Sequence, residues 1–582
     1  MGLKLRSGLA LTALFGLVYA LVFVIGIWNQ WSLWLMIGIT VGIVFLQYAI
    51  SPYIIQWIYK IEWIPFEKYE QMYPHLADTV KRAVELRGIK TPRVGIIRDG
   101  NPNAFTFGHT KNNARVVITT GILDYLDKDE QQAVMAHELG HVVHNDFILM
   151  TIVFAIPLVL LTIARWAYYA SWFSGMSRRS SRDEANYLRL VLIVVAVLSY
   201  VAYYIGYLIS LFISRIREYY ADEHSAELLG DPNALSTGLV KIAYGLVREG
   251  AAEDQKKSGV RALRGLGIFD PSRAQGLAAV STTTFRSKEK YSKEAIDAAA
   301  AWDLFNPWAK YYQLFSTHPL AAKRILRLNE KCEEKGIRPE IDFSQSRRIK
   351  EEQAGKTLFD QFLLDLTIKA LPLLIFLGLV GFSIAWLFSI VGLLSGIGFL
   401  SSFFSSIGLV DLLLVWAIGF YIIGFGFIIR TKFMYKSGYE PRTIRDLVSK
   451  VKASPIRAIP AYVEGTIVGK GMPGYYFAED LYLDDGTGIM YIDYRFGIGI
   501  VDFIFALRGA RKLAGQKVRV RGWYRRGPSP FIQVDRIETP QKTYKNYTRH
   551  LTYIWAVLSF IIGLVLLYFF FQISPYSFFG LF

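Results

Sequence analysis

Cysteine and histidine are both scarce in this chain. Its 582 residues include one cysteine, Cys332, and eight histidines. A single cysteine excludes an intramolecular disulfide framework and any zinc site made of several thiolates. A metal site in this chain must therefore use histidine and carboxylate ligands. We interpret Cys332 as an ordinary thiol on a charged helix.

Charged residues are also few. They make up 19% of the sequence, whereas hydrophobic residues make up 53% and aromatic residues 15%. This composition argues against an ordinary soluble protein and is typical of an integral membrane protein. The net charge of +17 is compatible with a nucleic-acid partner. Basic loops on a membrane protein usually report orientation and contact anionic lipid, so the lipid bilayer is the favoured partner.

Seven apolar runs are each long enough to cross a hydrocarbon core of about 30 Å. The first is too long for the apolar core of a signal peptide, so we interpret it as an anchor. The runs occupy residues 9–28, 31–49, 147–170, 188–214, 371–393, 409–430 and 551–571.

Basic residues beside these runs predict the orientation in the cell membrane. Lys4 and Arg6 precede the first run and Arg430 ends the sixth, so the positive-inside rule places both positions in the cytoplasm. The seventh span then leaves the C-terminus outside. The arginine-containing loop 172–187 weakly opposes this orientation, because it faces outward in the same arrangement.

The spans divide the chain into membrane and cytoplasmic segments. We expect two protease segments, the first with the metal motif and the second with a third ligand, and one C-terminal domain. The predicted segments are a two-span hairpin at 1–50, a protease segment at 51–146, a hairpin at 147–214, a protease segment at 215–356, a hairpin at 357–430, a β domain at 431–547 and a C-terminal span at 548–582.

The first protease segment shows alternating helix and strand signals. The sequence predicts a helix over about Pro74–Arg87, a strand over 93–97 and a hairpin-like pair over 103–108 and 114–121. Asp127 then begins a capping sequence for the next helix. A strand ahead of such a helix can bind an extended substrate through backbone hydrogen bonds, or it can belong to an ordinary core hairpin.

That next helix carries the motif with the clearest chemistry. His137 and His141 are four residues apart, so both imidazoles project from one helix face and can bind one metal ion. Glu138 lies beside that metal without being a ligand. Zinc lowers the pKa of a bound water to about 7, and a neighbouring carboxylate can accept its proton, which is metalloprotease chemistry. The alternative is a surface helix with two histidines and a glutamate by coincidence.

A second helical stretch supplies a candidate third ligand. Glu218 and Asp222 are four residues apart, so Glu218 can bind the metal while Asp222 orients a metal-bound imidazole. The two-span hairpin returns this stretch to the side of the membrane that holds the motif. Taken alone, it also fits a helix end with scattered charges. Phe147 occupies the position of the third metzincin histidine and excludes that subclass, and His144 is interpreted as a spare histidine.

Four ordered motifs together resemble the gluzincin family of membrane zinc peptidases, which contains the HtpX heat-shock proteases and the CAAX prenyl proteases. The resemblance covers about residues 10–330. The motifs are Asn103-Ala-Phe, His137-Glu-Leu-Gly-His141 followed by Asn145-Asp146, Glu218-Tyr-Tyr-Ala-Asp222 and Thr317-His-Pro-Leu-Ala-Ala-Lys-Arg-Ile.

The resemblance implies a role for each matching residue. It implies Zn2+ as the cofactor, Glu138 as the general base and Asp222 as the residue that orients a ligand. His318 and Arg324 match positions that stabilise the oxyanion and brace the site. The implied zinc ligands are His137, His141 and Glu218, and the implied substrate-pairing residues are Asn103, Ala104 and Phe105.

The order of elements is similar to HtpX, because only two spans precede the motif helix. We therefore expect a zinc endopeptidase that cleaves membrane or misfolded proteins, with polypeptide substrates. The alternatives are a processing protease of the CAAX prenyl-protein type and a non-catalytic membrane scaffold. The long polar segment Ala251–Trp302 is either an access element or an insertion.

Residues 455–540 have the pattern of a small all-β domain, with Asp485-Gly486 as a hairpin turn. The short apolar stretch Phe496–Leu507 fits a helix that plugs a barrel, so the domain resembles an OB-fold. Basic and aromatic residues on one strand allow single-stranded nucleic-acid binding, but alternating arginines more often form a solvated face, and we prefer an adaptor or membrane-surface role. These residues are Arg519, Arg521, Trp523, Arg525 and Arg526.

The sequence thus predicts a mainly α, polytopic membrane protein. It contains an α-helical, zincin-like metalloprotease domain with a small β-hairpin or edge strand, and a C-terminal all-β OB-like barrel. Because an apolar run begins at Phe147, we also expect the motif helix to lead straight into the bilayer.

Overall fold

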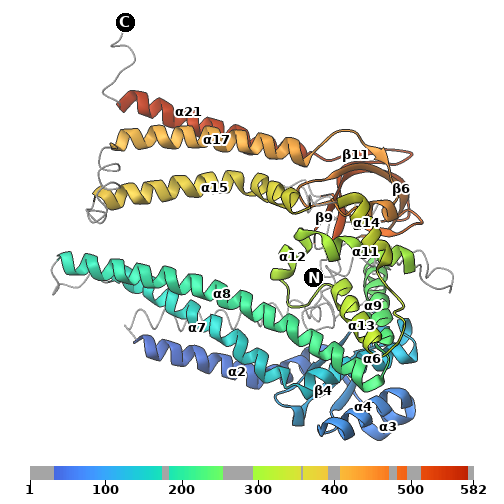
Figure 1. Cartoon of the computed structure of the whole chain (residues 1–582). Helices are drawn as coiled ribbons and strands as arrows, with labels where there is room; N and C mark the ends of the chain where they lie inside the picture. The colour runs from blue at the N-terminus through green and yellow to red at the C-terminus, as the bar shows by residue number, and fades with distance from the viewer. Residues whose placement is uncertain are drawn as a thin grey trace.

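The computed structural model describes residues 32–173, 182–252, 293–354, 358–390, 407–470, 481–494, 513–527 and 529–573 (Figure 1). The predicted first span at 9–28, the predicted barrel helix Phe496–Leu507 and most of the segment 251–302 lie outside these residues.

Six of the described helices are long and apolar enough to cross a membrane. Each contains most or all of one predicted apolar run, and several extend beyond it. The six helices are α2 (Leu33–Tyr59), α7 (Asp146–Phe173), α8 (Arg182–Leu229), α15 (Leu358–Ile390), α17 (Leu409–Met434) and α21 (Thr548–Ile573).

The six helices form two groups of three (Figure 1). In the first group α7 packs against α2 and α8, and in the second α17 packs between α15 and α21. A polar contact joins α7 to α8, where the Ser210 hydroxyl donates to the Val153 carbonyl at 2.8 Å. Close approach joins α17 to α21, because a Cβ on Gly424 would lie 2.7 Å from Phe560. Small and polar residues of this kind hold helices together where lipid removes the hydrophobic driving force.

The first protease segment contains a four-stranded sheet rather than an isolated hairpin. Its strands are β1 (Glu62–Trp63), β2 (Arg93–Ile97), β4 (Arg115–Thr119) and β3 (Ala104–Phe107), in that spatial order. β2 and β4 are parallel, and β3 pairs with β4 in the antiparallel direction. The predicted pair is therefore present, with β3 at the edge of the sheet. Two residues of β1 are too few to give an alternating pattern in the sequence.

Helices surround this sheet and form one core with it. Buried apolar side chains such as Leu76, Val134, Leu139 and Leu235 belong to that core. The helices of this core are α3 (Phe66–Met72), α4 (Pro74–Arg87), α5 (Thr120–Tyr125), α6 (Lys128–Val143), α9 (Pro232–Ala252), α11 (Lys293–Phe305) and α13 (Ala321–Glu334). α12 (Pro307–Leu314) and α14 (Ser344–Ala354) contribute to separate, smaller clusters, and a 3₁₀ turn η1 (Lys111–Asn113) precedes β4.

The motif helix α6 lies in the middle of this core. Asp127 caps it, because its carboxylate accepts from the backbone N–H of Glu130 while the Glu130 carboxylate accepts from the N–H of Asp127. Of its 16 residues, 11 are buried, including His137 and Glu138. The predicted alternative of a surface helix with coincidental histidines is therefore wrong.

The motif helix does not run straight into the bilayer. α6 ends at Val143, and Asn145 adopts a left-handed conformation with φ 54° before α7 begins at Asp146. Asparagine tolerates this conformation better than most residues with a side chain. The expectation of one continuous helix is therefore wrong, and the break turns Asp146 back toward α6.

The C-terminal region contains a closed barrel, as predicted. Its strands are β6 (Ile459–Lys470), β7 (Leu481–Asp484), β8 (Ile489–Asp493), β9 (Lys517–Arg526) and β10 (Pro530–Glu538). β6 pairs with both β7 and β9, β7 pairs with β8, and β10 pairs with β8 and β9, which closes the ring. A five-stranded barrel with such non-sequential pairing is OB-like. Short elements β5 (Glu440–Pro441), α18 (Ile444–Val448) and β11 (Thr543–Lys545) flank it.

The arginine-rich strand β9 is not one solvated face. Trp523, Arg525 and Arg526 are each at most 2% exposed. Arg525 donates to the backbone carbonyls of Pro455 and Met434, at 2.8 and 3.0 Å. The alternation in the sequence is that of an exposed strand, but one end of β9 is covered by the rest of the protein.

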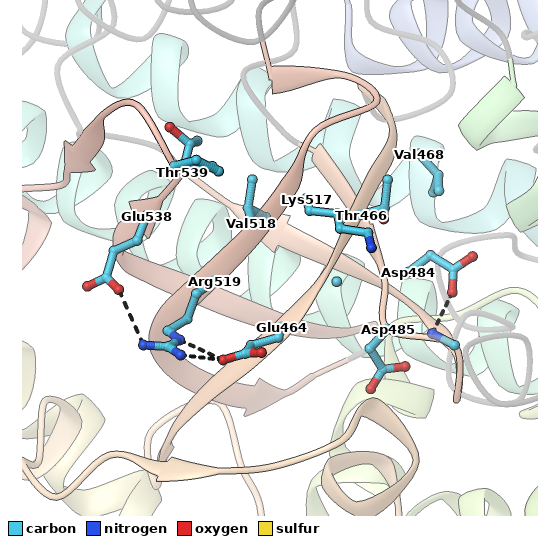
Figure 2. A pocket seen from close by; sticks show the side chains of 13 residues that line it. Glu464, Thr466, Val468, Asp484, Asp485, Lys517, Val518, Arg519, Glu538 and Thr539 are labelled. Atoms are coloured by element: carbon cyan, nitrogen blue, oxygen red, sulfur yellow. Dashed lines mark hydrogen bonds and ion pairs between the residues drawn. The ribbon is translucent and has the colours of Figure 1, made fainter.

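The outer end of β9 borders a cleft of about 660 Å³, where Arg519 is paired with Glu464 and Glu538 (Figure 2). Acidic side chains outnumber basic ones in its lining, four to two. Nucleic acid binds surfaces of the opposite charge balance, so this geometry does not support a single-strand groove. The charged lining residues are Glu464, Asp484, Asp485, Glu538, Lys517 and Arg519.

Candidate metal centre

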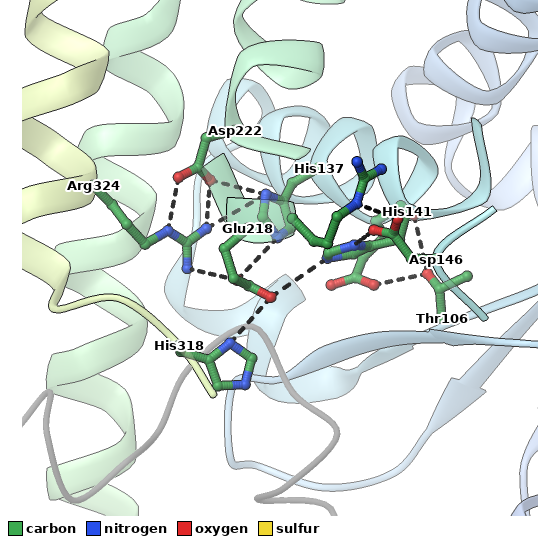
Figure 3. A network of polar contacts seen from close by, with 10 residues as sticks. Thr106, His137, His141, Asp146, Glu218, Asp222, His318 and Arg324 are labelled. Atoms are coloured by element: carbon green, nitrogen blue, oxygen red, sulfur yellow. Dashed lines mark hydrogen bonds and ion pairs between the residues drawn. The ribbon is translucent and has the colours of Figure 1, made fainter. Parts of the chain in front are cut away.

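The centre forms where α6 and α8 cross at very short distance. A Cβ added to Gly140 would lie 2.9 Å from the Cα of Ala221 and 3.2 Å from the Cβ of His224. Only glycine permits this approach without a shift of one helix. The contact brings Glu218 on α8 beside both histidines of α6 (Figure 3).

His137, His141 and Glu218 form the one potential metal-binding group of three or more ligands that the described residues contain. One ligand atom from each lies within 4.8 Å of the other two. Each histidine Nε2 is 3.8 Å from a Glu218 oxygen. The structure therefore brings together the three residues that the sequence analysis named as ligands.

The buried polar atoms of this group fit a cation. His137 Nε2 and Glu218 Oε2 are buried and make no hydrogen bond with the described residues. Buried polar atoms without partners are rare in proteins, because they lose their hydration without compensation. Two imidazole nitrogens and one carboxylate are the donor set of catalytic zinc sites, so the residues present fit that ion.

A buried ion-pair network fixes the orientation of His137. Its Nδ1 lies 2.9 Å from Asp222 Oδ1. Arg324 in turn donates to both oxygens of Asp222, from Nε at 2.9 Å and from Nη2 at 2.5 Å. With Nδ1 facing a carboxylate, Nε2 is left to face Glu218. Asp222 thus contacts one of the predicted ligands, and Arg324 contacts Asp222.

A second carboxylate orients His141 in the same way. His141 Nδ1 is hydrogen-bonded to Asp146 Oδ2 at 2.7 Å, and Arg217 Nε donates to Asp146 Oδ1 at 2.6 Å. Burial opposes a charge on His141, but the hydrogen bond to Asp146 and the carboxylates of Glu218 and Glu138 outweigh it and raise its pKa to about 9. The surroundings of His141 therefore favour a positive charge at this point, which either a proton or a metal cation provides.

Glu138 is connected to the edge strand of the sheet. Its carboxylate is buried, and its Oε2 accepts a hydrogen bond from the Thr106 hydroxyl at 2.7 Å (Figure 3). It is not part of the ligand group. This hydrogen bond engages one carboxylate oxygen of Glu138 and so fixes the orientation of the carboxylate group.

His318 lies in the loop between α12 and α13, next to Glu218. Its Nδ1 is 3.1 Å from Glu218 Oε1. Ser316 holds the loop, because its hydroxyl accepts from the N–H of His318 at 3.2 Å and its carbonyl accepts from Arg215 at 2.6 Å. A residue that sequence patterns place in a loop before a helix is thus brought to the metal centre.

Asn103, Ala104 and Phe105 lie at the start of the edge strand. The Asn103 carbonyl accepts from the N–H of Thr119 on β4, at 2.9 Å. Ala104 and Phe105 are fully buried, so this strand presents its backbone rather than these side chains. Its pairing with β4 uses one edge only.

Three polar residues at the centre were not singled out for it from the sequence. In the sequence Asp146 stands out only as part of a family motif, and no motif marks Arg217 or Thr106. The position of Arg217 next to Glu218 is a sequence signal for a place at the metal centre, whereas no sequence pattern predicts the contact of Thr106. His144, interpreted as a spare, packs against the rings of Tyr220 and His224 and lies outside the ligand group.

Comparisons with known proteins give the relatives of this chain. The sequence model of peptidase family M48 matches residues 70–332. A protease HtpX homolog of Methanothermobacter thermautotrophicus is 40% identical over 254 residues, which cover 43% of this chain and 90% of the relative. One of Thermococcus sibiricus is 30% identical over 338 residues, which cover 58% and 99%. The crystal structure of S. mikatae Ste24p aligns with a TM-score of 0.32 and 17% identity, over 55% of this chain and 64% of that one.

The family match ends before the barrel, which begins at Ile459, so the barrel is additional to the matched region. The relatives are covered nearly completely, and the metal-binding group lies inside the matched region. This multi-pass membrane chain therefore belongs to peptidase family M48, as a metallopeptidase of the HtpX type.

Proposed function

We propose that this protein is a zinc-dependent endopeptidase that hydrolyses membrane or misfolded proteins at the cytoplasmic surface of the cell membrane. The observation that carries the proposal is the convergence of His137 Nε2 and Glu218 Oε2, both buried and without hydrogen-bond partners among the described residues, beside Glu138. We assign His137, His141 and Glu218 as the ligands that hold the zinc.

A bound zinc ion would supply Lewis-acid chemistry, which polarises a substrate carbonyl and makes water more acidic. Glu138 accepts a proton from the attacking water through the oxygen that Thr106 leaves available, and returns it to the leaving amine. His318 donates a hydrogen bond to the oxyanion that develops on the carbonyl. Arg324 braces Asp222 and hence the imidazole of His137.

The substrate is proposed to bind as an additional strand. Asn103, Ala104 and Phe105 lie along the edge of the sheet, and an extended peptide pairs with such an edge through the backbone groups that β4 does not use. The backbone groups of Asn103 are themselves bonded to Thr119. The hydrogen bond between Thr106 and Glu138 places this edge within one side-chain contact of the general base. A peptide bound there reaches the base without a rearrangement of the sheet.

The position of the centre supports substrates at the membrane. α7 begins at Asp146, five residues after His141, and Glu218 on α8 follows the predicted apolar run 188–214 by four residues. The cytoplasmic orientation rests on Lys4 and Arg6 and the positive-inside rule. We also retain the seven segments proposed from the sequence, although α2 continues past residue 50 to Tyr59.

The proposal is tested with Glu138→Gln in the full-length protein. We expect the variant to bind zinc as the unaltered protein does and to lose cleavage of an unfolded polypeptide, including self-cleavage. Asp129→Asn, in the first turn of the same helix, is the matched control and keeps both properties. Unchanged cleavage by Glu138→Gln would reject the mechanism and favour the scaffold alternative. Cleavage restricted to prenylated peptides would favour the processing-protease alternative.

A further inference from the structure

The barrel is docked against the helices that lead to His318. We propose that it is a positioning element of the active site, in which Arg526 holds α11 and, through it, the adjoining α12, and thereby sets the loop that carries His318. The inference rests on the proposed role of His318 in catalysis.

The first contact is a buried ion pair between the barrel and the protease region. Arg526 Nη2 on β9 lies 3.1 Å from Asp303 Oδ1 on α11, and the two side chains are 1% and 4% exposed. The guanidinium also lies over the ring of Trp302, 5.0 Å from its centroid. A buried arginine must be paired, so separation of the barrel from α11 would leave two charges uncompensated.

The segment that leads into the barrel, which includes Val451 and Ala453, accepts hydrogen bonds from α11 and from the residue that caps α12. Trp302 Nε1 donates to the carbonyl of Ala453 at 2.7 Å. Asn306 Nδ2 donates to the carbonyl of Val451 at 2.6 Å, while its Oδ1 accepts from the N–H of Trp308 and caps α12. The residue that begins α12 is therefore held directly by the C-terminal region.

The second group of spans fixes α12 from another side. Trp308 Nε1 lies within hydrogen-bonding distance of Asp365 Oδ2 on α15, at 3.4 Å. The same carboxylate group accepts from Ser454 at 2.7 Å and from Arg457 at 3.0 Å. Asp365 is 1% exposed, so this junction of α12, α15 and the barrel linker is closed to solvent.

α12 is short, and its far end leads directly to the catalytic loop. It ends at Leu314, four residues before His318. Arg215 on α8 holds the intervening carbonyl of Ser316. His318 therefore lies between an anchor on α8 and a helix whose position the barrel sets. Release of α12 would change the place of the imidazole relative to Glu218, which is now 3.1 Å away.

The same strand supplies a matched control for this contact. Arg519, at the other end of β9, is about half exposed and pairs with Glu464 on the outside of the barrel. Exposed ion pairs contribute little to stability, so Arg519→Met changes the composition of the strand without changing its docking.

The test compares Arg526→Met with Arg519→Met in the full-length protein, with an unfolded polypeptide as substrate. We expect Arg526→Met to lower kcat by about 10- to 100-fold, the scale of a misplacement near 1 Å, with KM changed less than about twofold and zinc content unchanged. Arg519→Met keeps the kcat of the unaltered protein. An unchanged kcat for Arg526→Met overturns the inference. If Glu138→Gln also remained active, the proposed function itself would fail.

A second measurement separates positioning from general damage. If Arg526 acts through His318, Arg526→Met causes no further loss of kcat in a His318→Ala background. An equal loss in both backgrounds overturns the inference. Should Arg526→Met fail to fold, the double variant Arg526→Met with Asp303→Leu removes both buried charges and preserves an apolar contact. If this double variant folds and has the kcat of the unaltered protein, contact of the barrel with α11 is sufficient to position His318, as proposed. If it folds and its kcat is still reduced at least tenfold, the inference is contradicted.

Discussion

Arg324 is the buried cation that balances the carboxylates around the metal centre. It is 1% exposed, donates to both oxygens of Asp222 at 2.9 and 2.5 Å, and lies 3.5 Å from Glu218. Arg324→Met keeps much of the side-chain volume but leaves these acids without their partner. Removal of one member of a buried ion pair costs about 3–5 kcal/mol, and we predict a loss of that size in the free energy of unfolding of the metal-free protein.

Unfolding of the purified protein in detergent measures this loss. Arg327→Met is the matched control, because Arg327 is exposed on the same helix and its guanidinium lies 5.1 Å from the Tyr219 ring centroid. Such a contact is worth about 0.5–1 kcal/mol. Arg324→Lys keeps the charge but not the planar fork, so its loss should fall between those of the two methionine variants.

Zinc gives an independent check on the same electrostatics. A divalent cation that binds the folded state adds positive charge beside Glu218 and stabilises that state by mass action, so excess zinc should recover part of the loss in Arg324→Met. If Arg324→Met cost no more than Arg327→Met, the carboxylates would have to be hydrated or protonated, and the reasoning would be refuted.

Three further predictions concern neighbouring residues. Thr106→Val should lower kcat by a few fold, since it removes the hydrogen bond to Glu138, and Thr106→Ser should restore it; equal kcat in both variants argues against the contact. Asp146→Asn should weaken zinc binding about 10- to 100-fold by loosening His141, measured by competition with a chelator, and an unchanged affinity would contradict that role. Burial raises the pKa of Glu130 to about 6 from 4.5, so the folded state binds the proton more tightly than the unfolded state. The free energy of unfolding of the unaltered protein should therefore fall by up to about 2 kcal/mol as the pH rises from about 4.5 to about 6. Glu130→Gln should remove this pH dependence in unfolding measurements, and a persistent slope would assign it to another group.

Local patterns in the sequence were sufficient for many elements. Pro74–Arg87 and Arg93–Ile97 have the predicted bounds, and Asp127 caps α6 as expected. Each of these signals lies within one element: a proline in the first turn, an alternation of side chains, a carboxylate three residues from the backbone N–H that it accepts from. The ligand group was also predictable, because helical spacing selects His137 and His141 and the family motif adds Glu218.

The residues that contact those ligands were harder to predict from the sequence. The return of Asp146 to His141 depends on the left-handed turn at Asn145, and a continuous helix fits the same local composition. The contact between Thr106 and Glu138 joins residues 32 positions apart, and it forms only because β3 packs beside α6. Neither follows from periodicity alone.

The barrel gives the strongest example of a non-local determinant. Arg525 continues the alternation of Arg519 and Arg521, which is the pattern of a solvated strand face, whereas Arg526 lies on the opposite face of the strand. Their burial depends on acceptors elsewhere: Met434 at the end of α17, and Asp303, which is 223 positions from Arg526. A strand covered by another domain has the same local pattern as one that faces water.

The central claim is that zinc held by His137, His141 and Glu218 is required for peptide-bond hydrolysis. The most direct measurement is a zinc titration of the chelated, full-length protein with cleavage of an unfolded polypeptide as the readout. The account predicts no cleavage without zinc and a rise to a plateau at one zinc ion per chain, with no rise in Glu218→Gln at the same zinc concentrations. Cleavage that persists in the fully chelated protein, or an equal rise in Glu218→Gln, would contradict it.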